Sequence, residues 1–273
     1  MCGIFRPGIS IEMKKPGVSP FTYLVRLGGM LYIFSGTTLS YLMVPGNRRS
    51  LLSRARWLQR WSRRTLDLLG MEVEVKGELP KDGVVASNHL SYLDILVMSS
   101  IHPQIFLAKK EVAGWPLFGA FARWAGTEFI DRGRRSEVTA KATGFHRVVE
   151  SGLLLTLFLE GTTSDGSTVL PFRTALLEPA IQGGWSVTPC AIHYDAVGAD
   201  PAESICYHGS MTLVPHFLGL IGRVVTAKAT VRYGCADRSR TDRKQMAIRL
   251  HQEVLRLKME SASTRTAPQK DAD

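Results

Sequence analysis

The run at residues 153–159 (LLLTLFL) carries one threonine and no charged residue. A continuous apolar run of this length is typical of a strand that is buried on both faces in the centre of a sheet. From Met71 onward, β-like segments alternate with segments of helical character. The β-like segments are residues 71–75, 84–87, 105–108, 128–130, 187–193 and 224–232, and the helical ones are residues 92–100, 136–151, 174–182 and 243–259. This alternation predicts an α/β fold with a mixed, mostly parallel sheet flanked by helices.

The chain begins in a different way. Residues 1–20 form a polar lead without periodicity, and residues 27–44 form an uncharged run of helical length. A membrane span needs roughly 20 apolar residues, so this run is marginal, and its glycine, serine and threonine residues lower its hydrophobicity further. Because the run starts late and lacks a small-residue cleavage site, a cleaved signal peptide fits poorly. We expect a membrane-associated helical segment rather than a buried soluble helix; a transmembrane helix and insertion into one leaflet both stay open.

Residues 51–69 have leucines at three- and four-residue steps, as an amphipathic helix requires. Trp57 and Trp61 suit a membrane interface, and the arginines here suit lipid headgroups. The formal net charge of +10 fits nucleic acid or anionic lipid, and the position of these arginines after the apolar run favours the membrane. The alternative is a helix packed on the main domain with a solvated basic face, and both could hold on different faces of the helix. The arginines are Arg48, Arg49, Arg54, Arg56, Arg60, Arg63 and Arg64.

These patterns predict three parts: residues 1–69 with the membrane-associated segments, one α/β domain over residues 70–260, and a polar, flexible tail over residues 261–273. The arginine-rich side is expected to face the cytoplasm from the inner membrane. Four scattered cysteines form no CxxC pair, so we expect neither a metal site nor a disulfide framework. They are Cys2, Cys190, Cys206 and Cys235.

The first of three short motifs, NHLSYLD at residues 88–94, follows the strand at residues 84–87 directly. His89 and Asp94 can meet if His89 lies in the turn and Asp94 lies in the first turn of the next helix, where the helix dipole favours a carboxylate. An imidazole oriented by a carboxylate is the arrangement of a general base. The alternative is that Ser87 or Asn88 caps a helix and that His89 is incidental.

The other two motifs also stand at strand ends. In GTEFIDR, residues 126–132, Arg132 follows a short strand, and arginine suits bidentate phosphate recognition; a solvated basic turn is the alternative. In FLEGTTSDG, residues 158–166, Glu160 follows the buried strand at the edge where α/β folds usually bind ligands. Gly161 permits close backbone approach and Thr162 adds a donor, although a plain surface loop would look similar.

In this order, the motifs resemble the boxes of the phospholipid/glycerol acyltransferase family: NHxxxxD, GxxFIxR, FPEGTRS and an apolar strand with a VxPV-like end. The resemblance covers roughly residues 70–235. Leu159 stands where the family has proline, and Thr163 stands where it has an arginine associated with the acceptor's phosphate. The matching residues are Asn88, His89, Asp94, Gly126, Phe129, Ile130, Arg132, Phe158, Glu160, Gly161, Thr162, Ser164, Val187 and Pro189.

The resemblance implies direct acyl transfer from a thioester to the hydroxyl of a lysolipid, without a covalent enzyme intermediate or a cofactor. His89 would be the base and Asp94 would orient it. The donor would be a thioester of acyl carrier protein or coenzyme A, and no nucleic acid would bind. The headgroup of the acceptor would be bound by Arg132, Glu160, Gly161 and Thr162, with Asn88, Gly126, Phe129, Thr163 and Ser164 in support.

The acceptor is expected to be 1-acylglycerol-3-phosphate, the commonest in the family, with Arg132, Arg134 or Arg173 replacing the missing arginine. The alternative is lyso-ornithine lipid, because EGTTSDG resembles the branch that contains lyso-ornithine lipid acyltransferases.

Two other classes of function are disfavoured. A hydrolase that uses the same His89–Asp94 pair is disfavoured because the chain lacks a GxSxG nucleophile elbow, and a non-catalytic basic protein is disfavoured because three motifs stand at strand ends. The remaining histidines are expected to be uninvolved: His102 in a loop, His146 and His251 exposed on helices, and His193, His208 and His216 without a carboxylate partner.

Overall fold

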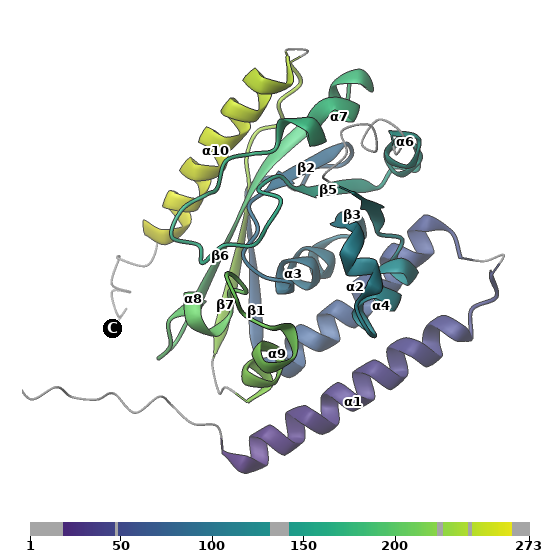
Figure 1. Ribbon diagram of the computed structural model, residues 1–273, viewed down its shortest axis with the longest axis vertical. Coiled ribbons are helices and arrows are strands. Elements are labelled where there is room, and N and C mark those ends of the chain that lie inside the picture. The colour runs from purple at the N-terminus through teal and green to yellow at the C-terminus, as the bar shows by residue number, and fades with distance from the viewer. Residues whose placement is uncertain (1–18, 47–48, 132–141, 223–225, 240–241, 264–273) are drawn as a thin grey trace, which may run out of the picture.

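The computed structural model describes residues 19–46, 49–131, 142–222, 226–239 and 242–263 (Figure 1). Its strands form one seven-stranded sheet in the order β1-β7-β6-β2-β5-β3-β4. Among the described strands, β6 and β7 pair antiparallel and all other neighbours pair parallel, which confirms the predicted mixed sheet. The strands are β1 (Met71–Lys76), β2 (Val84–Ser87), β3 (Gln104–Lys109), β4 (Glu128–Ile130), β5 (Leu154–Phe158), β6 (Val187–Ala196) and β7 (Ala227–Tyr233).

Helices cover both faces of this sheet. In the central strand β2, Val85 packs in a cluster with residues of α1, α2 and α3, whereas Val84 and Ala86 pack in another with residues of α6, α7 and α10. Figure 1 shows α10 on one side of the sheet and α2 and α3 on the other. The helices are α1 (Pro20–Leu42), α2 (Leu51–Leu69), α3 (Leu93–Ile101), α4 (Phe118–Ala125), α6 (Ala142–Glu150), α7 (Glu178–Gln182), α8 (Pro201–Ser204), α9 (Leu213–Ile221) and α10 (Arg243–Ser263), with 3₁₀ turns η2 (Lys110–Gly114) and η3 (Thr174–Leu177).

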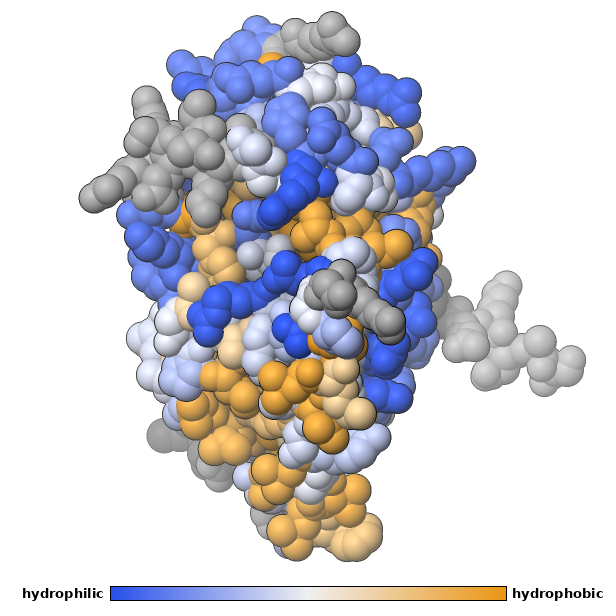
Figure 2. All heavy atoms as spheres, turned by 90° about the vertical axis from the view of Figure 1, so that its right-hand side faces the viewer, coloured by the Kyte–Doolittle hydropathy of each residue, from blue (hydrophilic) through white to orange (hydrophobic). Residues whose placement is uncertain are grey.

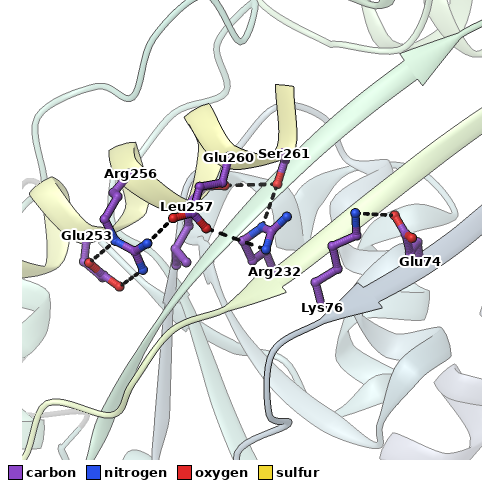
Figure 3. Close-up of polar contacts among 8 residues, drawn as sticks. All are labelled: Glu74, Lys76, Arg232, Glu253, Arg256, Leu257, Glu260 and Ser261. Atoms are coloured by element: carbon purple, nitrogen blue, oxygen red, sulfur yellow. Dashed lines mark hydrogen bonds and ion pairs between the residues drawn. The ribbon is translucent and has the colours of Figure 1, made fainter. Parts of the chain in front are cut away.

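Helix α10 is tied to the outer strands by polar contacts as well as by its apolar face. Arg232 of β7 points toward this helix, where its Nε donates to Ser261 Oγ at 3.2 Å and its guanidinium pairs with Glu260 at 3.6 Å (Figure 3). Arg256 of α10 pairs with Glu253 on the same helix. The contacts of Arg232 hold α10 against the face opposite α2 and α3, whereas the Arg256–Glu253 pair lies within the helix.

The first helix is longer than the apolar run predicted. It begins at Pro20 because Ser19 caps it: the Ser19 Oγ accepts a hydrogen bond from the Thr22 N–H, and proline suits the first helical position. Helix α2 has the predicted bounds; Ser50 caps its start and Gly70, in the left-handed conformation at φ 68°, ends it just before β1. The predicted helix at residues 136–151 is described only from Ala142, since residues 132–141 lie outside the described ranges.

The prediction that Trp57 and Trp61 face the membrane interface is wrong. Their exposed fractions are 7% and 6%, and both indole N–H groups donate to Ser40 Oγ of α1, at 3.1 and 2.9 Å. A buried tryptophan needs a hydrogen-bond acceptor for its N–H, and α1 supplies one. Helix α2 therefore packs between α1 and the sheet, and its buried residues share the core of the α/β part.

The arginines of α2 divide into two groups. Arg54 and Arg63 donate to backbone carbonyls of other segments, including a 2.7 Å bond from Arg63 Nε to Ser100, so they help to fix the helix in place. Arg56, Arg60 and Arg64 lie exposed.

In the described part of the chain, no helix combines the length and the apolar character that a membrane crossing requires, so the transmembrane helix that the sequence left open gains no support.

Candidate active site

The first and third motifs meet at one edge of the sheet. In the parallel register of β2 and β5, Ser87 pairs with Phe158, so both strands end side by side. The loops that follow, residues 88–92 and 159–166, therefore leave the same edge. This is the carboxyl edge of the parallel strands, where α/β folds place their ligand sites.

His89 and Asp94 lie in contact, as the sequence predicted. The Nδ1 atom of His89 is 2.7 Å from Asp94 Oδ2, and Asp94 lies in the first turn of α3. The His89 ring stacks on Phe158, with centroids 3.9 Å apart and planes at 10°. When Asp94 is ionised, it accepts the proton on Nδ1, so Nε2 carries the free lone pair. This is the tautomer that a general base requires.

The carboxylate of Asp94 has no exposed surface, and every oxygen of it is bonded. Besides the imidazole, Oδ2 accepts the backbone N–H groups of Leu90 at 2.7 Å and Ser91 at 3.1 Å. Oδ1 accepts the hydroxyl of Tyr194, in β6, at 2.7 Å. Tyr194 lies outside the residues predicted from the sequence. Its only sequence signal is the alternation along β6, which puts it on the same face as Ile192.

Asn88 has a structural place beside the pair. Its amide is fully buried and bonds Ile192 of β6 in both directions: Nδ2 donates to the carbonyl at 3.0 Å, and Oδ1 accepts the N–H at 2.7 Å. The Asn88 side chain thus makes the two hydrogen bonds that a further strand residue would make, and it continues the pairing of β2 with β6 one residue past the end of β2. It thereby fixes the start of the loop that carries His89.

The third motif holds the backbone of His89 at both ends. Glu160 Oε1 accepts the His89 N–H at 3.1 Å, and the Ser164 N–H donates to the His89 carbonyl at 3.0 Å. Glu160 is only 3% exposed. The sequence expectation put Glu160 on the acceptor's headgroup; its carboxyl instead lies behind His89, where it orients the loop.

Burial changes the acidity of Glu160. Loss of solvation raises its pKa from 4.5 to about 7, although the N–H groups of His89 and Leu170 and the charge of Lys258 oppose the shift. Lys258 of α10 is itself buried and donates to the carbonyls of Gly166 and Thr168. Lys258 of α10 therefore anchors the loop of the third motif. Within that motif, the pKa of the Glu160 carboxyl lies near neutral pH.

The middle of the third motif, Gly161 to Thr163, faces the cavity. Gly161, with φ 75°, lies directly under the side chain of Arg173, and a Cβ at this position would overlap the guanidinium. Gly161, Thr162, Thr163 and Arg173 line the same cavity as His89. Arg173, named from the sequence only as one possible cation, is thus brought to the site by the backbone bond from its N–H to Leu159 at 2.8 Å.

The second motif lies further along this cavity. Gly126 ends α4 with φ 90°, Thr127 lines the cavity, and Phe129 lies in β4. Arg132 and Arg134, the predicted phosphate ligands of this motif, lie outside the described residues. Among the described residues of this motif, Thr127 is the one that lines the cavity.

The cavity has a volume of about 690 Å³ and a mostly apolar lining. Helices α1, α2, α3 and α4 supply its walls, and three tryptophans, Trp57, Trp61 and Trp115, line it. His89 is one of the polar residues in this lining, together with Lys109, Arg173 and several threonines. A space of this size and character suits a long apolar ligand whose reacting end lies at the imidazole.

The other histidines differ in part from expectation. His193 does have a carboxylate nearby, since its Nε2 lies 3.5 Å from Asp195 two residues along β6. His216 bonds the Tyr92 hydroxyl at 3.0 Å. His146 and His251 were expected to be exposed and are half-buried, because His146 packs against Trp185 and His251 reaches the Val169 carbonyl at 3.0 Å. His102 ends α3, and His208 lies 3.3 Å from the Ala202 carbonyl.

Comparisons with known proteins agree on one family. The family model described as Acyltransferase matches residues 71–193. The lyso-ornithine lipid O-acyltransferase of Rhizobium meliloti is 35% identical over 217 residues, 72% of each chain. That of Brucella abortus is 30% identical over 259 residues, 88% of this chain and 97% of its own. A 1-acyl-sn-glycerol-3-phosphate acyltransferase of Neisseria gonorrhoeae is 37% identical over 137 residues, 50% of this chain and 54% of its own.

A solved structure has the same fold. The 1-acyl-sn-glycerophosphate acyltransferase PlsC from Thermotoga maritima superposes with a TM-score of 0.61 and 19% identity, over 89% of this chain and 95% of that one. At this identity the likeness concerns the architecture of the sheet and its helices.

The raised pKa of Glu160 predicts a pH-dependent stability. Between pH 4.5 and about 7 the folded chain holds a proton that the unfolded chain has released, so the unfolding free energy falls as pH rises through this window. In Glu160→Gln that loss is absent, so its stability relative to wild type should improve from pH 5 to pH 8 by on the order of 2 kcal/mol. Urea unfolding at both pH values measures it. The exposed Glu150→Gln is the control, and equal slopes for all three proteins would contradict the prediction.

Proposed function

The chain belongs to the acyltransferase family, and from that premise we propose that it moves a fatty acyl chain from a thioester onto the hydroxyl of a lysolipid. One observation carries the proposal: His89, held by the buried Asp94 behind it, lines an apolar cavity of about 690 Å³. A general base at the wall of an apolar chamber suits a reaction that joins a hydroxyl to a long hydrocarbon chain.

In the proposed reaction, Nε2 of His89 takes the proton of the acceptor hydroxyl while that oxygen attacks the carbonyl carbon of the thioester. Nδ1–H stays bonded to Asp94, whose charge stabilises the imidazolium. The C–S bond then breaks, and the proton on Nε2 passes to the leaving thiolate. The products are an ester and a free thiol. The donor is a thioester of acyl carrier protein or coenzyme A, and no cofactor takes part.

The acceptor's headgroup would lie against the third motif. Thr163 lines the cavity where the family pattern has an arginine, which favours lyso-ornithine lipid, the acceptor named for two relatives matched over most of their length. Arg173 lies in the same wall and offers the cation that the phosphate of 1-acylglycerol-3-phosphate would need. Both acceptors therefore have a specific residue in their favour, and Arg132 remains a predicted ligand for either headgroup.

We also propose that the enzyme works on the cytoplasmic surface of the inner membrane, inserted into one leaflet through α1. Apolar side chains gather on the lower part of the face in Figure 2, and Figure 1 places α1 at that end. An exposed apolar helix face next to arginines suits interfacial binding to anionic lipid. The exposed apolar residues of this face recur at helical spacing: Phe21, Leu24, Val25, Leu31, Tyr32, Leu39, Leu42 and Met43.

Removing the base should abolish most of the turnover. General-base catalysis is typically worth about 10²–10⁴-fold, so His89→Ala should lose at least about 10²-fold in kcat while its melting temperature stays near that of wild type. The assay uses purified protein, acyl-carrier-protein and coenzyme A thioesters, and both lysolipids. His193→Ala is the control, because this histidine also lies near a carboxylate but outside the cavity. A folded His89→Ala protein with normal kcat would rule out the mechanism.

The position of Thr163 predicts a change of acceptor preference. Thr163→Arg restores a charge-assisted hydrogen bond worth roughly 1.5–3 kcal/mol, so kcat/KM for 1-acylglycerol-3-phosphate should rise roughly tenfold to hundredfold. For lyso-ornithine lipid it should stay the same or fall. The matched control is Thr168→Arg, an exposed threonine of the same loop outside the cavity lining. An equal rise with both acceptors, or with the control, would argue against a headgroup role for position 163.

The proposed membrane-binding face of α1 can be tested by substitution. Deleting the N-terminal segment is unsuitable, because it would also remove α2 from the core. Replacing two exposed leucines of α1 (Leu31→Asp with Leu39→Asp) should reduce co-sedimentation with phosphatidylglycerol vesicles at least tenfold, since each charge opposes insertion of an apolar face. The control places the same two aspartates on α10, at the exposed Ile248 and Met259. Equal binding by both double variants would exclude α1 as the insertion surface.

A further inference from the structure

We propose that Tyr194 is a positioning residue of the reaction: its hydroxyl holds the carboxylate of Asp94 in the orientation that serves His89. The inference rests on the proposed acyl transfer, because it concerns the same base. Tyr194 lies in β6, outside the three motifs, and a hundred residues separate it from Asp94 in the chain.

The two oxygens of Asp94 have different partners. Oδ2 lies 2.7 Å from His89 Nδ1, and Oδ1 lies 2.7 Å from the Tyr194 hydroxyl. Asp94 is fully buried and Tyr194 is 2% exposed, so water cannot replace either bond. Turning the carboxylate about its Cβ–Cγ bond would break both contacts together. The hydroxyl on Oδ1, together with the Leu90 and Ser91 N–H groups on Oδ2, therefore fixes the plane of the group that orients the imidazole.

A second contact fixes the register of Tyr194 against the motif. Asn88 bonds Ile192 in both directions, two residues before Tyr194 on the same face of β6. The loop from Asn88 to Asp94 is thus attached to β6 at both of its ends. This arrangement leaves little freedom for Tyr194 to swing away from the carboxylate.

The hydroxyl can act only as a donor here. Burial and the neighbouring negative charge of Asp94 raise the pKa of Tyr194 well above its usual value, so it stays protonated at any working pH. During the reaction His89 becomes positive, and the charge of Asp94 is then shared between the imidazolium and the hydroxyl. Without the hydroxyl, Oδ1 would be a buried acceptor with no donor, and Asp94 would attract the proton of the imidazolium more strongly.

Other titratable groups face this cluster from several elements. Burial raises the pKa of Cys206 to about 12, and it raises the pKa values of Tyr92 and Cys190 above the working range, so these three stay neutral. Glu160, whose pKa burial raises to about 7, is present in both proteins, and its carboxyl bonds the backbone of His89 rather than Tyr194. A difference between the two pH profiles therefore reports on Asp94 and His89.

The test is the pH dependence of single-turnover acyl transfer in Tyr194→Phe, which keeps the ring and removes the hydroxyl. We expect the rate to fall roughly tenfold, the acid limb of the profile to move up by about half a pH unit, and KM for both substrates to stay within about twofold. A purely structural role would change stability or KM and leave the acid limb in place. An unmoved acid limb in a folded Tyr194→Phe protein would overturn the inference.

Tyr233→Phe is the matched control. Tyr233 lies on the neighbouring strand β7, is buried, and its hydroxyl has no hydrogen-bond partner among the described residues, so its loss should leave the profile unchanged. A shift in this control equal to that of Tyr194→Phe would count against the inference.

A second variant covers the case in which Tyr194→Phe does not fold. Site-specific 3-fluorotyrosine at position 194 is a stronger donor of nearly the same shape, so it should move the acid limb to lower pH. Movement to higher pH, or none, would contradict the inference. If the wild-type protein transfers acyl groups to neither lysolipid, the proposed function fails; if it does so and the position-194 profiles match it, only the role of Tyr194 fails.

Discussion

The buried charge of Asp94 is the constraint on which the rest of the site depends. A carboxylate without exposed surface is costly unless donors surround it, and its donors come from the motif loop, the imidazole and a distant strand. The sheet has to form in its full register before they converge. The arrangement of His89 and Asp94 therefore depends on the whole fold, even though both residues lie in one short motif.

Much of this could be predicted from local patterns. The run ending at Phe158 identified the central strand, and the strand–turn–helix reading of NHLSYLD placed His89 against Asp94 correctly. Local patterns did not reveal that Glu160 turns inward to the His89 backbone or that Tyr194 reaches Asp94, because both depend on which strands become neighbours. Trp57 and Trp61 were misplaced for the same reason: their partner, Ser40, lies on another helix, and an amphipathic pattern does not say what covers each face.

The first two helices link the site to its surroundings. Helix α2 buries one side against the sheet and the other against α1, and both helices contribute walls to the apolar cavity. The same α1 exposes apolar residues on its outer side. Helix α1 therefore lines the cavity on one side and exposes apolar residues on the other, which is the arrangement that the proposed insertion into one leaflet requires. The proposed substrates would then pass from leaflet to base over a short apolar path.

The crowding of indole rings around the cavity has a spectroscopic consequence. The chain has five tryptophans, and Trp57, Trp61 and Trp115 line the cavity, while Trp124 packs on Trp57 with ring centroids 6.3 Å apart. The surroundings of Trp57, Trp61 and Trp115 therefore change when a hydrocarbon chain enters the cavity, and the intrinsic emission of the unmodified protein should change with them. The protein carries its own optical reporter of occupancy, and ligand titrations can follow it without an attached dye.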